Sequence, residues 1–265
     1  AYCAKLIGDH RYRDAAIATG AIIELLKSQP MDSEFVELAE QHGHCLRMVG
    51  ENPQAINVLE QILDSEVKLT DEFRADVLVN LAMAYQRTNR DSDALDAVKK
   101  IDEISHPESS NAFQAKGIYA EITMAGASLK SRLRELELEA RNKGRRVAAD
   151  NIALKLAQDA EDPEEALSIL EKVLQTNGDT YNRTRAIIEK AAILSRHFRF
   201  SDLHPRDYRI LSEAYSYCYA QRFGTLLDRC HRVLWAMCVR EKMGIVLLRL
   251  FRFSSFIWTV EHACE

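Results

Sequence analysis

Residues 75–107, with the sequence ADVLVNLAMAYQRTNRDSDALDAVKKIDEISHP, decide the fold class of this chain. Within them, Leu78, Leu81 and Tyr85 recur at the three- and four-residue spacing that is typical of the buried face of an α-helix. The polar run 88–92 interrupts this pattern, and a second apolar stripe follows it. The stretch therefore predicts two antiparallel amphipathic helices joined by a short turn.

Small residues recur at a nearly constant interval along the chain. Ala16, Ala55 and Ala94 are 39 residues apart, and Ala166 follows after a further 72, which is twice 36. Each lies early in an alanine- and leucine-rich stretch. A period of this size indicates an array of supersecondary units, in which each unit buries its apolar face against the next. Helix pairs of this kind, stacked along the chain, form an α-solenoid.

The helix pair at 75–107 resembles a tetratricopeptide repeat, in which small residues let two helices approach and large apolar residues fill the seam. The matching positions are Leu78, Leu81, Ala82, Tyr85, Ala94, Val98, Ile101 and Pro107. A second copy comprises Ala39, His42, Gly43, Leu46, Ala55, Leu59 and Ile62, and a weaker one Ala149, Ile152, Ala153, Leu156, Ala166, Leu170 and Val173. The resemblance covers about residues 1–175, and it implies an all-α solenoid that recognises a protein or peptide.

The resemblance also implies that the first helix of each pair lines a concave, protein-binding face. We expect the outward neighbours of the packing positions to form this face. They are Glu37, Glu40, His44, Arg47, Asp76, Val79, Asn80, Met83, Gln86, Arg87, Gln114, Ile118, Glu121 and Ile122. The set mixes acidic, basic and apolar side chains, so it does not single out a ligand.

Nothing in the sequence points to catalysis or to a cofactor. No phosphate-binding loop, dinucleotide-binding glycine motif, H-E-x-x-H or G-x-S-x-G motif is present. The six cysteines contain no C-x2-C pair, which argues against the common zinc and redox sites and favours a reducing compartment. We therefore expect a non-enzymatic, cytoplasmic scaffold or sensor module with no cofactor and no metal. His42 is expected to be a core histidine rather than a metal ligand.

Charge divides the chain into two parts. Residues 1–182 hold 21 Lys and Arg against 32 Asp and Glu, whereas residues 183–265 hold 14 against 8. We interpret the first part as the acidic tetratricopeptide-like repeats and the second as basic helical repeats packed on the same solenoid. An alternative function is nucleic-acid binding by the basic part, through arginines that alternate with aromatic residues. The candidate contacts are Arg196, Arg199, Arg249 and Arg252.

The apolar stretch 245–260 is interrupted by Arg249 and Arg252, so it does not provide the roughly 20 apolar residues that cross a bilayer. It must be covered either by the helix predicted at 223–240 or by another chain. The chain also begins within a helical pattern, without an initiator methionine. We interpret it as the recognition arm of a larger signalling or defence protein, whose other domains are further candidate partners.

Overall fold

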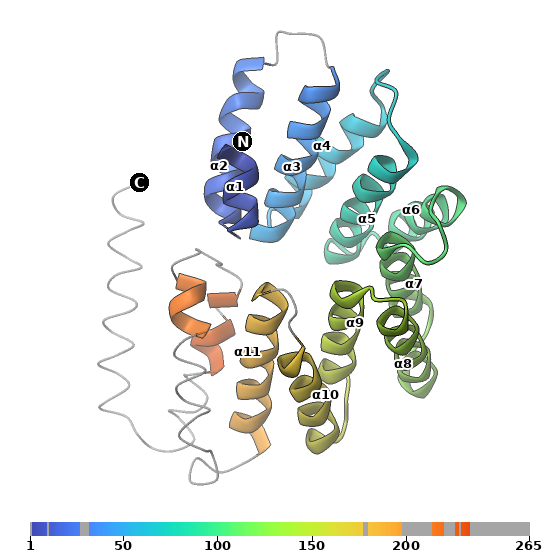
Figure 1. Ribbon diagram of the computed structural model, residues 1–265, viewed down its shortest axis with the longest axis vertical. Helices are drawn as coiled ribbons and strands as arrows, with labels where there is room; N and C mark the ends of the chain where they lie inside the picture. The colour runs from blue at the N-terminus through green and yellow to red at the C-terminus, as the bar shows by residue number, and fades with distance from the viewer. Residues whose placement is uncertain are drawn as a thin grey trace.

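The computed structural model describes residues 2–9, 11–26, 32–176, 180–197, 214–219, 226–227 and 229–233. Within these ranges the chain is helical and contains no strand, which confirms the predicted all-α class. Short helical segments at 214–219, 226–227 and 229–233 follow the last labelled helix (Figure 1). The labelled helices are α1 (Tyr2–Gly8), α2 (Tyr12–Leu26), α3 (Ser33–Val49), α4 (Asn52–Leu63), α5 (Asp71–Arg87), α6 (Asp91–Ile104), α7 (Ser110–Thr123), α8 (Gly126–Asn142), α9 (Arg146–Gln158), α10 (Pro163–Gln175) and α11 (Thr180–His197).

The helices form two layers of a curved solenoid. Each helix packs against the next along the chain, as expected for antiparallel pairs joined by short turns. Beyond these neighbours, α3 contacts α5, α5 contacts α7, α7 contacts α9, and α9 contacts α11. The odd-numbered helices from α3 to α11 therefore stack on one another as a continuous layer. Figure 1 shows this layer following the inside of the curve.

The periodic alanines lie at the contacts between helices. Ala55 and Ala94 have no exposed surface, and Ala16 and Ala166 are 8% and 2% exposed. Ala94, on α6, packs in one cluster with Leu81 and Tyr85 of α5. Because a methyl group is the largest side chain that these contacts hold without separating the helices, the 36- to 39-residue interval marks the repeat of the fold.

The close approach of α3 and α4 depends on Gly43. A Cβ atom at this position would lie 2.7 Å from Cγ and Cδ2 of Leu59, well inside van der Waals contact. Gly43 is the small residue expected from the repeat pattern. At the C-terminal end of the same helix, Gly50 ends α3 in a left-handed conformation with φ 95°. Both glycines are thus required by local geometry.

The two ends of the solenoid meet. Leu6, Tyr12 and Ala15 of the first two helices share a hydrophobic cluster with Ile188 of α11 and with Cys218, which follows it. Figure 1 shows the curve bringing α11 back toward α1 and α2. The boundary drawn between residues 182 and 183 from the charge balance falls inside α11, which packs on α9 and α10.

Candidate binding site

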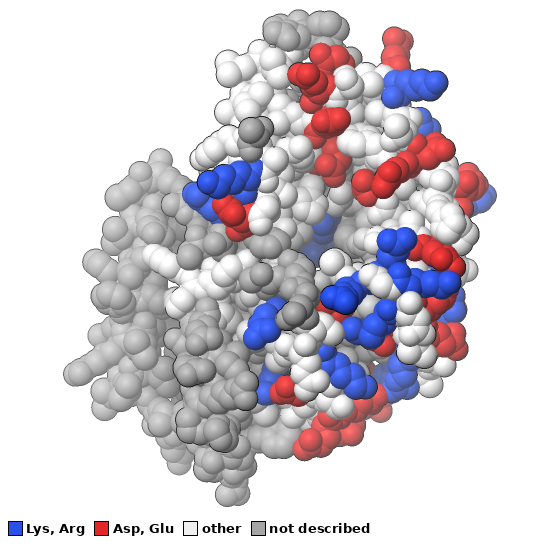
Figure 2. All heavy atoms as spheres, viewed as in Figure 1, with Lys and Arg blue, Asp and Glu red and all other residues white. Residues whose placement is uncertain are grey.

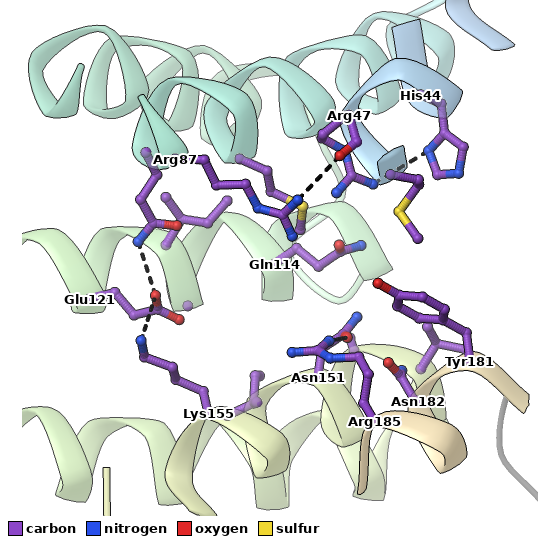
Figure 3. A pocket seen from close by; sticks show the side chains of 18 of the residues that line it. His44, Arg47, Arg87, Gln114, Glu121, Asn151, Lys155, Tyr181, Asn182 and Arg185 are labelled. Carbon is purple, nitrogen blue, oxygen red and sulfur yellow. Dashed lines mark hydrogen bonds and ion pairs between the residues drawn. The ribbon is translucent and has the colours of Figure 1, made fainter. Parts of the chain in front are cut away.

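The inner layer of helices surrounds an open cavity of about 450 Å³. Side chains from α3, α5, α7, α9 and α11 line it, and Tyr12 contributes from the start of α2. Figure 3 shows them pointing toward one another from opposite walls. The lining residues are Tyr12, His44, Arg47, Met48, Met83, Gln86, Arg87, Gln114, Gly117, Ile118, Glu121, Val147, Ala148, Asn151, Ile152, Lys155, Gln158, Tyr181, Asn182 and Arg185.

The structure brings together one part of the predicted concave face. Those predicted residues that line the cavity are His44, Arg47, Met83, Gln86, Arg87, Gln114, Ile118 and Glu121. Glu37 and Asp76 are exposed but lie outside the cavity lining. Glu40 and Asn80 lie beneath Arg47 as its supporting network, while Ile122 packs against two core clusters.

Val79 was expected to face outward, and this expectation is wrong. Its side chain is 5% exposed and belongs to the cluster that joins α5 to Ala115 and Ile118 of α7. The inner helices contact one another along their flanks, so α5 buries more than the single stripe that faces α6. A helix packed on both sides has fewer free positions than a periodicity argument assigns to it.

About half of the cavity wall consists of residues on α9 and α11 that were not predicted from the sequence. Asn151 and Lys155 lie on α9, and Tyr181, Asn182 and Arg185 lie on α11. Those on α9 could have been predicted from the weak repeat at Ala149, Ile152, Ala153 and Leu156, because its outward neighbours include residues 151 and 155. The residues of α11 could not have been predicted in this way, because α11 begins after residue 175, where the resemblance to repeats ends.

Arg47 is held in the wall of the cavity by a polar network. Its Nε donates to Oδ1 of Asn80 at 2.8 Å, and Nδ2 of Asn80 donates to Oε1 of Glu40 at 3.1 Å. The arginine is only 7% exposed. Burial, followed by the nearby charge of Arg87, lowers the pKa of Arg47 to about 10. Among the described residues, no carboxylate forms an ion pair with Arg47, whereas a guanidinium buried to this extent usually has such a partner.

Two more arginines face the same space. Nη1 of Arg87 donates to the backbone oxygen of Arg47 at 3.2 Å, and Nη1 of Arg185 donates to Oδ1 of Asn151 at 3.2 Å. Burial lowers the pKa of Arg185, and the charge of Arg87 also contributes to that shift. Figure 3 shows Arg87 and Arg185 reaching in from facing helices. The three arginines therefore form one positively charged group.

The acidic side chain of the cavity is already engaged. Oε2 of Glu121 accepts a hydrogen bond from Nε2 of Gln86 at 2.9 Å and lies 3.5 Å from Nζ of Lys155. Glu121 thus links α5, α7 and α9 and offsets the charge of Lys155 rather than that of the arginines. The lining carries four cationic side chains, Arg47, Arg87, Lys155 and Arg185, against this single carboxylate.

Charge on the outer surface is distributed differently. Figure 2 shows Asp and Glu gathered over the region of α3 to α5, and Lys and Arg over the region of α7 to α9. Cations at the end of α8 form ion pairs, as in Arg141 with Glu137 and Lys143 with Glu108. Basic side chains on this face therefore belong to residues 1–182, although that part of the chain has a net negative charge.

Of the candidate nucleic-acid contacts, Arg196 lies in the last turn of α11 and is exposed. Arg199, Arg249 and Arg252 lie outside the described residues, as does the apolar stretch 245–260. Nucleic-acid binding therefore stays a prediction. Among the described helices, none combines the length and apolar character needed to cross a membrane.

His42 is half-buried between α3 and α2, where its ring lies against Gly20. Its Nδ1 lies 2.9 Å from Oγ1 of Thr19, and burial lowers its pKa. The described part of the chain contains no group of three His, Cys, Asp or Glu side chains placed to hold a metal. Cys3, Cys45, Cys218 and Cys230 are free and buried.

Glu40 makes the stability of the inner layer pH-dependent. Burial, followed by the charge of Asp76, raises the pKa of Glu40 to about 7 from an ordinary value of 4.5. Between these values the folded chain holds a proton that the unfolded chain has released, so the free energy of unfolding falls as the pH rises.

Glu40→Gln is expected to raise the free energy of unfolding at pH 8 by about 1 to 2 kcal/mol and to change it little at pH 5. The glutamine keeps the acceptor for Asn80 and removes the buried charge. Urea denaturation at the two pH values measures this effect. Glu37→Gln, at an exposed position of the same helix, is the matched control and should be neutral at both. Equal effects of the two substitutions at pH 8 would contradict the assignment.

Comparison with protein-family models and with curated proteins finds no match to this chain. Its function must therefore be inferred from the cavity and the side chains around it.

Proposed function

We propose that the protein is a non-enzymatic recognition module that binds an extended segment of another protein in the cavity along its inner helices. The observation that carries this proposal is the composition of the cavity wall. Gln114 and Asn151 present amides from α7 and α9, and an amide group can both donate and accept hydrogen bonds. Such groups suit the alternating N–H and C=O groups of a peptide backbone.

Apolar groups in the same wall suit the side chains of that segment. Met48, Met83 and Ile118 line the cavity beside the amides. Methionine adapts to different apolar partners because it is unbranched and polarizable. A concave site with apolar walls and a few convergent polar groups is the usual form of a ligand-binding pocket. The resemblance to tetratricopeptide repeats supports the same class of ligand, and a role as the recognition arm of a larger signalling or defence protein fits this proposal.

Gly117 allows the proposal to be tested by blocking the cavity. It lines the cavity from within α7, and a Cβ added there would meet Cγ1 of Ile152 at 3.9 Å, an ordinary contact. Gly117→Ala should therefore leave the wall intact, whereas Gly117→Met extends a flexible side chain into the space. Both substitutions remove a helix-interior glycine, so neither should lower the melting temperature.

The experiment selects ligands from an unphosphorylated random-peptide display library with the wild-type chain, and it then measures their affinities by calorimetry. We expect Gly117→Met to weaken binding at least tenfold, with Gly117→Ala close to wild type. A library that yields no ligand, or ligands bound equally by both variants, would overturn the proposed function. Circular dichroism melting of the three proteins confirms that the affinities refer to folded material.

A further inference from the structure

Three arginines from helices far apart in the sequence converge on the cavity. Arg47 comes from α3, Arg87 from α5 and Arg185 from α11. In the part of the chain that the structure describes, no Asp or Glu forms an ion pair with any of the three. Their hydrogen bonds instead go to Asn80 and His44, to a backbone carbonyl and to Asn151.

The three charges are close enough to affect one another. The charge of Arg87 lowers the pKa of both Arg47 and Arg185, in addition to the effect of burial. The charges of Glu40 and Glu189 offset part of this repulsion at Arg47 and Arg185, respectively. Like charges in a partly desolvated site destabilise the empty protein, so an anion placed among the three arginines gains from all of them. Each guanidinium has five N–H donors, and the bonds described above use only one or two of them.

We infer that Arg47, Arg87 and Arg185 form a binding site for a phosphate monoester carried by the ligand of this cavity. A phosphate monoester holds a charge of about −1.5 to −2 at pH 7 and presents three acceptor oxygens, which match three separate guanidinium groups. A single carboxylate would engage one arginine fully and leave two uncompensated. The inference deepens the proposed function by naming the chemical group that is recognised, and it rests on the cavity being the binding site.

The remaining space in the cavity is available to the group that carries the phosphate. A volume of about 450 Å³ lies within the range of pockets for ligands much larger than an isolated phosphate. A phosphorylated peptide and a nucleoside monophosphate share the required chemistry, and the amide of Gln114 on α7 can hydrogen-bond to either. Binding measurements with one probe of each kind distinguish these sources.

The probes are the tripeptide Ac-Gly-phosphoserine-Gly-NH2 and AMP, with the unphosphorylated tripeptide and adenosine as their controls. Calorimetric titrations at fixed ionic strength are expected to show at least tenfold tighter binding of a phosphorylated probe than of its control. The probe with the higher affinity identifies the carrier. Binding that does not differ between the phosphorylated and unphosphorylated members of both pairs would overturn the inference.

Variants assign the binding to the arginines. Arg87→Gln and Arg185→Gln should each weaken binding of the phosphorylated probe at least tenfold, without lowering the melting temperature, because each relieves repulsion in the empty cavity. Arg74→Gln is the matched control, since Arg74 is exposed on α5 and does not line the cavity. Wild-type affinity in both cavity variants would place the phosphate elsewhere and overturn the inference. The two proposals can fail separately. If library peptides bind the wild-type chain and are excluded by Gly117→Met, but neither phosphorylated probe binds more tightly than its control, the phosphate inference is overturned and the proposed function stands.

Discussion

Ala94→Arg is expected to lower the free energy of unfolding by about 3 to 5 kcal/mol, because it forces a long cation into a sealed contact between two helices. Ala94 has no exposed surface and packs in one cluster with Leu81, Ala84 and Tyr85 of α5. An arginine there must either displace α6 or leave its guanidinium without a partner. Urea denaturation followed by circular dichroism measures the change.

Asp96→Arg provides the matched control for this substitution. It introduces the same side chain two residues further along α6, at an exposed position. Exposed substitutions away from caps and buried networks usually change stability by less than about 0.5 kcal/mol. If the two variants unfolded at the same urea concentration, the register assigned to α6 would be incorrect.

Tyr12→Ala is expected to cost about 3 kcal/mol and to loosen the contact between the two ends of the solenoid. Tyr12 is 6% exposed, and its ring meets the edge of His44 at 5.4 Å and of Tyr181 at 6.3 Å between centroids. It therefore connects α2 with α3 and with α11. Without this ring, α11 loses an aromatic contact to the N-terminal helices, and small-angle X-ray scattering should record a larger radius of gyration.

Tyr2→Ala removes the same side chain from α1, where it is 67% exposed. It should change the free energy of unfolding by less than about 0.5 kcal/mol. The scattering profile should match that of the wild type within experimental error. A Tyr12→Ala protein with the wild-type radius of gyration would show that other contacts, such as those of Leu6 and Ile188, maintain the closure without the tyrosine.

The sequence by itself determined the helices and the contacts within each pair. The interval between Ala55 and Ala94 and the three- and four-residue spacing around Leu81 follow from the 3.6-residue turn of a single helix, so they can be read without knowing where the chain goes next. The same local geometry placed Met83, Gln86 and Arg87 on the inner face of α5, where the structure has them.

Only the tertiary structure decided which of these faces meet. The rotation between successive helix pairs is small, and its sum over the repeats determines whether the ends of a solenoid separate or touch. That sum depends on many side-chain contacts between pairs, such as the burial of Val79 against α7, and no short stretch of sequence encodes it. The accumulated curvature brings α11 across from α3 and α5, and for this reason Arg185 shares a cavity with Arg47 and Arg87.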